Sequence, residues 1–497
     1  MRGDLILAID QGTTNTKAVL VDGTGSPVFR TSRQIALITT PRGFTEQDPE
    51  CLWESVLDVI AGSVKHAHGS GASIAAIAIS NQRETALAWD ASTGRPVAPA
   101  ISWQCGRGAA VCARLGRHAK EIRARTGLPL APLISATKWA WLLEHDPAIG
   151  RLGREGRLRL GTVDSWLIHG LTRGSVHATD LTNASRTGLL NLSTLQWDPE
   201  LLELFGIPGN TMPELRPSSS RFGHCKSLPE LEGIPIMSAL GDSHAAMFGH
   251  GRYAAGTVKA TYGTGSSLMA LTPALAMDVR ELARTIAWSI GDDIQYAVEG
   301  NIVMTGSAIQ WLGEFLALSN PASDVAALAA TVSDSEGVYF VPAMVGLGAP
   351  YWDASARGAI SGLCRSHGSA HLARAAMDSV AFQVADVFFA MEEATVMRFR
   401  ELHADGGATR NAPMMQFQAD ILGRPVLRSM NEELSAIGAA WLAGIAAGWW
   451  SAPADLESRS CASDCFEPEM NRTQRDALYK GWKTAVAKVC SQETVHE

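Results

Sequence analysis

The sequence predicts an α/β protein made of two related halves. Apolar runs with β character alternate with helical patterns along all 497 residues. A strand–turn–strand pattern with Gly and hydroxyl residues in its turn occupies residues 5–22, and a similar pattern occupies residues 257–271. Such a recurrence is typical of a duplicated architecture. We therefore predict one domain at residues 1–250 and a second at residues 251–497.

Helical patterns are expected between the strands of each half. They cover residues 50–64, 371–392 and 435–450. The Pro-, Gly- and Ser-rich stretch at residues 206–220 is typical of a surface connection.

Composition and charge exclude several function classes. Hydrophobic residues make up 46% of the chain and charged residues 19%, as in soluble globular proteins. The formal net charge of −8 argues against a nucleic-acid partner. No apolar run reaches the roughly 18 residues that cross a bilayer. The eight cysteines include no CxxC pair and are expected to be free thiols, so we predict a cytoplasmic protein.

The first hairpin places polar groups directly after an apolar strand. Residues 5–9 are apolar, and Asp10 precedes the turn Gly12-Thr13-Thr14. A Gly followed by hydroxyl side chains offers N–H and O–H donors that can hold phosphate oxygens. An ordinary β-hairpin has the same pattern, so the turn alone leaves both interpretations open.

Two further strand ends carry side chains suited to a small polar ligand. Arg83 and Glu84 follow the apolar strand at residues 74–80, and Trp103 follows a shorter strand. A cation beside a carboxylate can bind a vicinal diol, and the indole can form an apolar wall. A surface ion pair of little energetic value is the alternative for Arg83 and Glu84.

The stretch at residues 234–249 contains the residue on which the functional interpretation depends. An apolar run ends at Gly241, Asp242 follows, and a helical pattern of small residues begins. Open α/β sheets bind their ligands outside the carboxyl ends of such strands. A carboxylate there can also cap the helix, so capping is the alternative to a catalytic role.

The second half repeats these features. Its hairpin has the turn Gly263-Thr264-Gly265, a helix with small residues begins at Gly306, and paired glycines at 406–407 permit close approach to a ligand. The chain lacks a GxxxxGK(S/T) loop and has no GxGxxG after its first strand. We therefore expect nucleotide phosphates to lie between two facing hairpins.

Taken in order, these motifs resemble the FGGY carbohydrate kinases, most closely their glycerol kinase branch. The matching segments are Asp10-Gln11-Gly12-Thr13-Thr14, Asn81-Gln82-Arg83-Glu84-Thr85, Trp103-Gln104-Cys105, Gly161-Thr162-Val163-Asp164, Gly241-Asp242, Tyr262-Gly263-Thr264-Gly265, Gly348-Ala349-Pro350-Tyr351-Trp352-Asp353 and Asp405-Gly406-Gly407-Ala408. The resemblance covers nearly the whole chain. It implies two actin-like (ribonuclease H-like) domains around a central cleft. It also implies transfer of the ATP γ-phosphoryl group to a terminal hydroxyl of a small polyol or sugar, with glycerol as the first candidate.

The resemblance also implies roles for individual residues. Asp242 matches the catalytic base, and Asp10 matches the carboxylate that positions Mg²⁺, usually through water. Arg83, Glu84 and Trp103 match substrate-pocket positions, together with Asp242. The positions implied to bind ATP are Thr13, Thr14, Lys17, Gly263, Thr264, Gly306, Ile309, Gln310, Gly407 and Asn411.

Three pocket positions depart from the glycerol kinase pattern. Leu133 stands where that branch has a tyrosine, Ser243 where it has a glutamine, and Ser267 where it has a phenylalanine. Each change reduces bulk. The changes favour a roomier pocket for an alditol of erythritol or pentitol size, and neutral repacking is the alternative.

Other function classes that fit parts of the sequence can be told apart by their activity and by the residues they need. A kinase for a longer alditol or a ketose would share the motifs. An actin-like ATPase would hydrolyse ATP without a polyol and would not need Arg83, Glu84 and Trp103. A sensor that has lost catalysis would not need both Asp10 and Asp242. As partners we expect a small polyol or sugar, no nucleic acid, no membrane insertion, and assembly as a homodimer or homotetramer.

Overall fold

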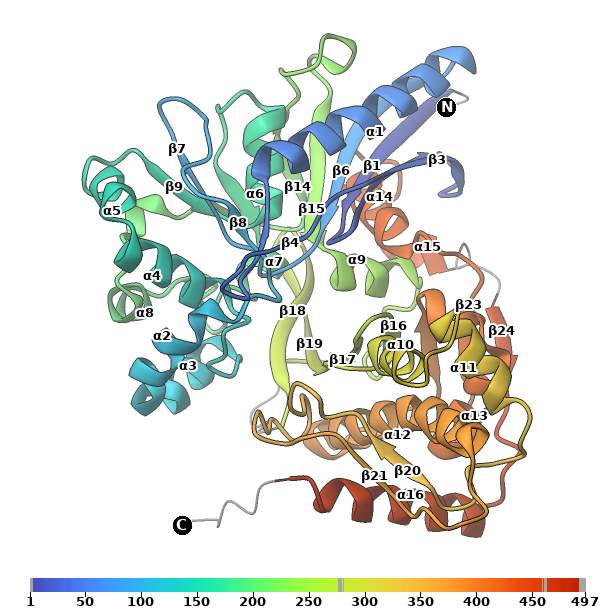
Figure 1. The fold of residues 1–497 in the computed structure, drawn as a ribbon. Helices are drawn as coiled ribbons and strands as arrows, with labels where there is room; N and C mark the ends of the chain where they lie inside the picture. Colours follow the sequence, from blue (N-terminus) through green and yellow to red (C-terminus); the bar gives the residue numbers. More distant parts are fainter. Residues whose placement is uncertain (1–2, 276–278, 280, 458, 460–462, 491–497) are drawn as a thin grey trace. The chain divides into compact units, whose positions relative to one another are not determined.

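The computed structural model contains two compact units, and each is described by itself. It describes residues 3–275, 279, 281–457, 459 and 463–490. The first unit contains residues 1–253, 284–296 and 433–460, and the second contains residues 254–283, 297–432 and 461–497. The labels used below are those of Figure 1.

The first unit is a mixed sheet with helices and several small sheets around it. Its strands are β1 (Asp4–Gln11), β2 (Asn15–Asp22), β3 (Pro27–Gln34), β4 (Ile38–Thr39), β5 (Thr45–Gln47), β6 (Ser73–Asn81), β7 (Leu87–Asp90), β8 (Ala100–Ile101), β9 (Leu158–Gly161), β10 (Ala178–Asp180), β11 (Leu190–Asn191), β12 (Gln196–Trp197), β13 (Glu214–Arg216), β14 (Ser219–His224), β15 (Pro235–Gly241) and β18 (Ala283–Ile290). Its helices are α1 (Pro49–Gly69), α2 (Ala109–Leu115), α3 (Ala119–Thr126), α4 (Ser135–His145), α5 (Pro147–Arg154), α6 (Val163–Leu171), α7 (Leu181–Ala184), α8 (Pro199–Phe205), α9 (Asp242–Gly249), α14 (Leu434–Ala446) and α15 (Ala454–Glu457). Short 3-10 turns are η1 (Gly106–Gly108), η2 (Gly116–His118), η3 (Gly209–Thr211) and η4 (Pro229–Leu231).

The main sheet of the first unit has the strand order β18-β14-β15-β6-β1-β2-β3. Strands β1, β2 and β3 run antiparallel as a meander, whereas β6 pairs parallel with both β1 and β15. The parallel part explains why residues 5–9 and 74–80 read as continuous apolar runs, since strands of this kind are buried on both faces. Leu5, Leu7 and Ile9 pack in one cluster with apolar side chains of α1.

Helix α1 begins where its sequence supplies a capping residue. The Asp48 side chain accepts a hydrogen bond from the backbone N–H of Glu50, and Pro49 occupies the first helical position. The helix is longer than the predicted range of residues 50–64, because Val64 and Ala67 continue its buried stripe to Gly69.

Helices α9 and α14 cross at a very short separation. A Cβ atom on Gly438 would lie 1.9 Å from the carbonyl oxygen of Ala245, and one on Gly249 would lie 2.4 Å from that of Leu434. Only glycine allows the two backbones to meet this closely. The contact fixes α9, which follows directly after β15, against a helix from the far end of the chain.

The second unit repeats the topology of the first around its own core. It contains β16 (Val258–Tyr262), β17 (Ser266–Thr272), β20 (Tyr339–Val341), β21 (Ala359–Ser361), β22 (Leu402–Asp405), β23 (Val426–Ser429), β24 (Ser463–Phe466), α10 (Gly306–Phe315), α11 (Pro321–Ala329), α12 (Ser369–Thr395), the 3-10 turn η5 (Gly407–Arg410), α13 (Ala412–Leu422) and α16 (Arg472–Ala487), and β19 (Asp293–Ile302) enters it from the first unit. The strand order is β24-β23-β22-β16-β17-β19. As with β1, strand β16 forms an antiparallel hairpin with the next strand and pairs parallel with a later one, β22.

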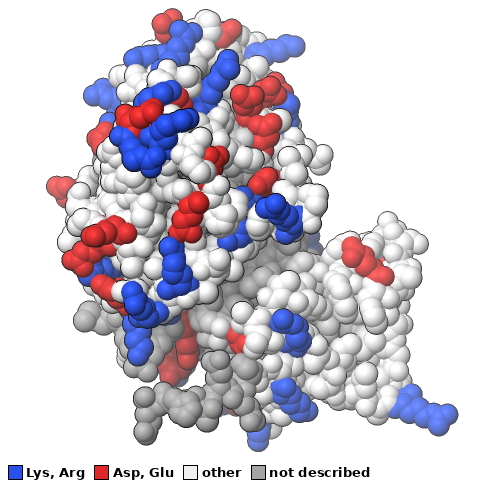
Figure 2. Space-filling view, turned by 60° about the vertical axis from the view of Figure 1, so that its left-hand side comes forward, with Lys and Arg blue, Asp and Glu red and all other residues white. Residues whose placement is uncertain are grey.

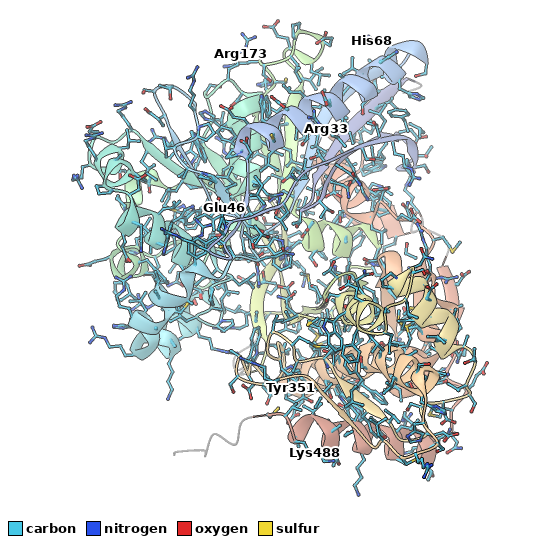
Figure 3. All side chains as sticks on the ribbon, viewed as in Figure 1. Arg33, Glu46, His68, Arg173, Tyr351 and Lys488 are labelled. Atoms are coloured by element: carbon cyan, nitrogen blue, oxygen red, sulfur yellow. The ribbon has the colours of Figure 1, made fainter. Side chains whose placement is uncertain are left out.

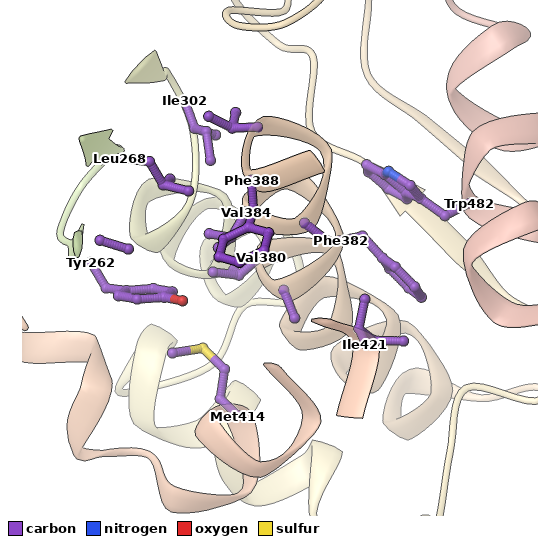
Figure 4. Packing of buried hydrophobic residues seen from close by; sticks show 14 of the residues in the cluster. Tyr262, Leu268, Ile302, Val380, Phe382, Val384, Phe388, Met414, Ile421 and Trp482 are labelled. Carbon is purple, nitrogen blue, oxygen red and sulfur yellow. The ribbon is translucent and has the colours of Figure 1, made fainter. Parts of the chain in front are cut away.

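This repeated topology confirms the predicted α/β fold of two related halves. The core of the second unit lies around α12, where Val380, Val384 and Phe388 pack with Tyr262 and Leu268 of the hairpin strands (Figure 4).

A buried carboxylate joins α16 to the rest of the second unit. Asp386 of α12 accepts hydrogen bonds from the hydroxyls of Tyr351 and Tyr479, at 2.8 and 2.6 Å, and from the indole of Trp482 at 2.7 Å. Tyr351, labelled in Figure 3, belongs to the Gly348–Asp353 motif noted in the sequence. Asp386 therefore holds this motif in place together with the C-terminal helix.

Two local predictions need correction. The helix predicted at residues 435–450 ends at Ala446, because Gly448 adopts a left-handed conformation and Trp450 folds back over Gly444. The predicted surface connection at residues 206–220 contains η3, β13 and the start of β14.

The structure also describes the thiols, the helices and the surface charges. Seven cysteines are free thiols, and Cys461 lies outside the described residues. In the part of the chain that the structure describes, no helix is long and apolar enough to cross a membrane. Basic and acidic side chains are interspersed over the face shown in Figure 2.

The helix crossing gives a first testable prediction. Gly438→Ala places a methyl group 1.9 Å from the Ala245 carbonyl oxygen, so it must push α9 and α14 apart. We expect the free energy of unfolding to fall by about 2–4 kcal/mol in chemical denaturation.

Gly69→Ala is the matched control, because no atom lies within 4 Å of its added Cβ. That variant should change stability by less than about 0.5 kcal/mol. Equal stability of the two variants would contradict the close crossing.

Candidate active site

The register of three parallel strands brings the predicted residues of the first unit to one edge. Gln11 of β1 lies opposite Asn81 of β6, and Asn81 lies opposite Gly241 of β15. The segments that follow these residues therefore leave the sheet at the same level. They carry the turn of the first hairpin, residues Arg83 and Glu84, and Asp242.

Asp242 occupies the first turn of α9, and the cap position is Gly241. Its Oδ1 accepts the backbone N–H of Ser243 at 2.6 Å and lies 3.5 Å from Nε of Arg83. Its side chain is 39% exposed. A carboxylate that is open to solvent and next to a buried cation can meet a ligand. The N-cap position itself is Gly241, so Asp242 lies one residue inside the helix.

Asp10 lies close enough to Asp242 for the two carboxylates to repel each other. Burial, and then the charge of Asp242, raises the pKa of Asp10 from its usual 3.8 to about 6, against the lowering effect of Lys17 and of a hydrogen bond from Ser80. That bond, from the Ser80 hydroxyl to Asp10 Oδ1, is 2.8 Å long. A cation would relieve the repulsion.

These carboxylates fit a hard divalent cation that keeps several waters. Mg²⁺ is commonly held by one or two carboxylates together with substrate phosphates. In the described ranges, no group of three or more His, Cys, Asp or Glu residues could hold a metal ion by itself. The donor set therefore suits a cation that arrives with a nucleotide.

The turn of the first hairpin is held by hydrogen bonds from the protein around it. The N–H of Gly12 donates to the carbonyl of Asn15 at 2.9 Å, and Gln47 Nε2 donates to the carbonyl of Thr13 at 2.8 Å. The Trp103 indole donates to Thr13 Oγ1 at 2.9 Å, which links the predicted pocket wall to the hairpin. Thr14 is exposed. The turn is therefore fixed, with hydroxyl groups at its tip.

Lys17 lies on the second strand of this hairpin and is paired to a distant part of the chain. Its ammonium group lies 2.9 Å from Oε2 of Glu433, just before α14. Glu433 is 10% exposed at its side chain, whereas Lys17 is 34% exposed. The ammonium group is thus oriented by a buried carboxylate and reachable from solvent.

Arg83 and Glu84 are buried, so the surface ion-pair alternative is wrong. Their exposed fractions are 9% and 5%. Glu84 has a positive φ of 60°, an unusual backbone conformation for a side chain of this size. Its carboxylate pairs with Nε of Arg186 at 2.7 Å. Such strained, buried groups cluster at functional sites.

Two of the departing positions also lie in this unit. Leu133 is half-buried, and its carbonyl accepts a hydrogen bond from the ammonium group of Lys138. Ser243 is 8% exposed, directly beside Asp242.

The predicted nucleotide positions of the second unit come together at the end of its hairpin. The N–H of Gly306 donates to the carbonyl of Gly263 at 3.0 Å, and the N–H of Ser307 donates to that of Thr264 at 3.0 Å. A Cβ atom on Gly306 would lie 2.5 Å from the Gly263 oxygen. The turn thus rests on the N-terminus of α10, and Gly263 and Thr264 remain exposed.

The paired glycines border the same hairpin. Gly406 has φ 96°, and a Cβ atom there would lie 2.3 Å from the carbonyl oxygen of Tyr262. No atom lies within 4 Å of a Cβ built on Gly407, so that residue leaves room for a ligand. Asn411 caps α13 by accepting the N–H of Met414 at 2.9 Å.

The remaining predicted residues of this unit have protein partners. Gln310 is exposed and donates to Glu314 at 2.8 Å along the same helix, whereas Ile309 is 7% exposed. The third departing position, Ser267, donates from its hydroxyl to the buried Glu299 at 3.0 Å.

Sequence reasoning missed several residues that support the site. Arg186, Lys138 and Glu433 contact predicted residues but lie in polar or helical segments without a motif of their own. A signal was present for Arg186 alone, since it lies in a stretch of turn-forming residues at 180–187 that lacks another evident role.

Comparison with known proteins agrees with this geometry. Residues 5–249 match the N-terminal domain of the FGGY family of carbohydrate kinases, and residues 258–447 match its C-terminal domain. The chain is 45% identical over 489 residues to a glycerol kinase of Burkholderia multivorans, which covers 98% of each chain.

Solved structures show the same likeness. The crystal structure of Plasmodium falciparum glycerol kinase with ADP is 31% identical, has a TM-score of 0.92 and covers 99% of each chain. A gluconate kinase from Lactobacillus acidophilus has a TM-score of 0.88 at 23% identity and shares the fold. The predicted enzyme class, a carbohydrate or polyol kinase, is confirmed, and this chain belongs to the FGGY family of carbohydrate kinases.

Proposed function

We propose that this protein transfers the γ-phosphoryl group of ATP to a terminal hydroxyl of glycerol, and that it requires Mg²⁺. The observation that carries the proposal is the placement of Asp242 beside Arg83 and close to Asp10 at one strand edge. The glycerol kinase likeness over nearly the full chain supports glycerol as the acceptor. The two FGGY matches support the predicted boundary near residue 250, although residues 284–296 and 433–460 pack with the first unit.

Each proposed role follows from the chemistry of the side chain. Asp242 accepts the proton of the attacking hydroxyl, and Arg83 orients that carboxylate. Glu84 accepts hydrogen bonds from the remaining hydroxyls, and Trp103 covers the carbon face of the substrate. Phosphoryl transfer needs positioning and charge stabilisation more than covalent chemistry.

The nucleotide positions divide between the two hairpins. Thr13, Thr14 and Lys17 of the first hairpin and Gly263 and Thr264 of the second offer hydroxyl, ammonium and N–H donors to phosphate oxygens. In the second unit, Gly306, Ile309, Gln310, Gly407 and Asn411 would border the nucleoside. Asp10 would hold Mg²⁺ through water, and the ion would neutralise the developing charge on the phosphates.

A longer alditol is the second candidate acceptor. The observation that favours it is the Ser267 hydroxyl of the second unit, a small polar group that donates to the buried Glu299 at 3.0 Å. Leu133 and Ser243 complete the set of small side chains. A panel of glycerol, erythritol, pentitols and ketopentoses tests the choice through specificity constants. Glycerol should have the highest kcat/KM, and an advantage of about tenfold or more for erythritol or a pentitol would overturn it.

Asp242→Asn tests the proposed base. The amide keeps the size of the side chain but cannot accept the proton, so we expect kcat to fall by about a hundredfold or more. ATP binding, measured by calorimetry, should change little. Turnover near that of the wild type would remove Asp242 from this role.

Asp10 gives a prediction on pH. Because its pKa is raised to about 6, the carboxyl is protonated below that pH in the ligand-free protein. Mg²⁺ favours the ionised form, so the Mg²⁺ concentration for half-maximal activity should rise as pH falls through about 6. Saturating Mg²⁺ should move the acid limb of the activity profile to lower pH.

Asp10→Asn tests the same shift through stability. Because the pKa of Asp10 is higher in the folded protein than in the unfolded chain, the folded state binds this proton more tightly. Protonation of Asp10 therefore stabilises the folded state at pH values below 3.8, and this contribution is lost as pH rises through about 6. At pH 8 the variant should therefore be more stable than the wild type by about 1–2 kcal/mol. It should also be inactive, because it lacks the carboxylate proposed to hold Mg²⁺. Reduced stability at pH 8 would contradict the charge repulsion at this site.

A further inference from the structure

We propose that Arg186 is a positioning residue that determines polyol affinity by holding the carboxylate of Glu84. The inference rests on the proposed function, in which Glu84 binds the polyol. Arg186 lies in the stretch at residues 180–187, a segment that the proposed mechanism does not otherwise use.

The contact between the two side chains is short and enclosed. Nε of Arg186 lies 2.7 Å from Oε1 of Glu84, and the side chains are 2% and 6% exposed. A carboxylate buried without a cation is strongly unfavourable, so the ion pair with Arg186 stabilises the Glu84 side chain in this buried position. A carboxylate has about four acceptor positions, so this bond leaves capacity for substrate hydroxyls.

The backbone of Glu84 is held from a second direction. Its carbonyl oxygen accepts hydrogen bonds from the Ser135 hydroxyl at 3.1 Å and from Nζ of Lys138 at 3.3 Å. Lys138 is fully buried and also donates to the carbonyl of Leu133. These contacts maintain the strained conformation at φ 60°, while Arg186 fixes the end of the side chain.

The segment that carries Arg186 is itself tied to the strand ends of the site. Asn183 exchanges two hydrogen bonds of 3.0 Å with Asn81 at the end of β6. Thr182 Oγ1 accepts the N–H of Gly241, the residue before Asp242, at 2.9 Å. Asp180 caps α7 by accepting the N–H groups of Thr182 and Asn183. Arg186 therefore holds a defined position relative to β6 and β15.

This geometry separates polyol binding from nucleotide binding. Arg186 contacts Glu84 just after β6, and its segment contacts Asn81 and Gly241 at the ends of β6 and β15. The segment's other hydrogen bonds join it to Ala136, Asp164, Ser218 and Thr285. The proposed phosphate donors lie instead on the hairpins. Loss of Arg186 should therefore displace Glu84 and weaken the binding of the polyol while the binding of ATP stays the same. A general effect on folding would instead weaken the binding of both substrates.

Arg186→Gln tests the inference through steady-state kinetics. We expect KM for glycerol to rise by about 10- to 100-fold, kcat to fall by less than about tenfold, and KM for ATP to stay within about twofold. Thermal stabilisation of the protein by glycerol alone should also be lost.

Arg125→Gln is the matched control. Arg125 of α3 pairs with the buried Asp198 at 3.0 Å outside the candidate site. Its loss should lower stability while KM for glycerol stays within about twofold of the wild type. If Arg186→Gln raises KM for glycerol and for ATP equally, Arg186 has only a structural role and the inference is wrong.

Arg186→Lys keeps the buried positive charge, so it tests the inference if the Arg186→Gln variant does not fold. An ammonium group cannot reproduce the planar guanidinium fork, so KM for glycerol should still rise by about tenfold. A value within about twofold of the wild type would overturn the inference. If the wild-type protein shows no polyol-dependent turnover, the proposed function fails, whatever the Arg186 variants do.

Discussion

The parallel register of β1, β6 and β15 is the constraint on which the candidate site depends. Because Gln11, Asn81 and Gly241 lie side by side at the ends of these strands, the segments that follow leave the sheet together. Asp10, the Arg83–Glu84 pair and Asp242 are far apart in the chain and meet only for this reason. A one-residue slip in either pairing would turn side chains to the opposite face of the sheet.

The structure has to stabilise several charges that lie close together in partly buried surroundings. Burial and the repulsion from Asp242 together raise the pKa of Asp10. The cations Arg83, Arg186 and Lys17 each face a carboxylate of the site or of its border. Such arrangements are poor sources of stability compared with apolar packing. Their value lies in orientation, because each carboxylate has a fixed direction before a substrate arrives.

The glycine contacts between α9 and α14 serve the same purpose through packing. Asp242 begins α9, and α9 is held against α14 at Gly249 and Gly438. The hydroxyl of Ser435 in α14 also donates to the carbonyl of Asp242 at 3.0 Å. The position of the proposed base thus depends on a helix almost two hundred residues later in the sequence.

The sequence predicted the strand ends because their signal is local. An apolar run that stops at a charged residue marks a buried strand near its end, and both Asp10 and Asp242 follow such runs. The predictions of the two hairpins and of the α/β fold succeeded for the same reason. The Leu133, Ser243 and Ser267 positions were recognised only through the family resemblance.

Other parts of the site could not be predicted, because their partners are distant in sequence. The stretch at residues 180–187 has the composition of a turn, and nothing local shows that Arg186 pairs with Glu84 across 102 residues. The Lys17–Glu433 pair spans 416 residues. The end of α14 at Ala446 depends on Gly448 and on the return of Trp450, so the apolar pattern alone extended that helix too far.

The central claim is that the residues at this strand edge make the protein a polyol kinase. Its most direct test is to measure the formation of ADP and of the phosphoester in the same reaction. With saturating Mg²⁺ and ATP, ADP release should be slow without a polyol. Added glycerol should accelerate it by about a hundredfold or more, with one phosphorylated polyol formed for each ADP. Rapid ADP release that is independent of any polyol, with no phosphoester formed, would contradict the account.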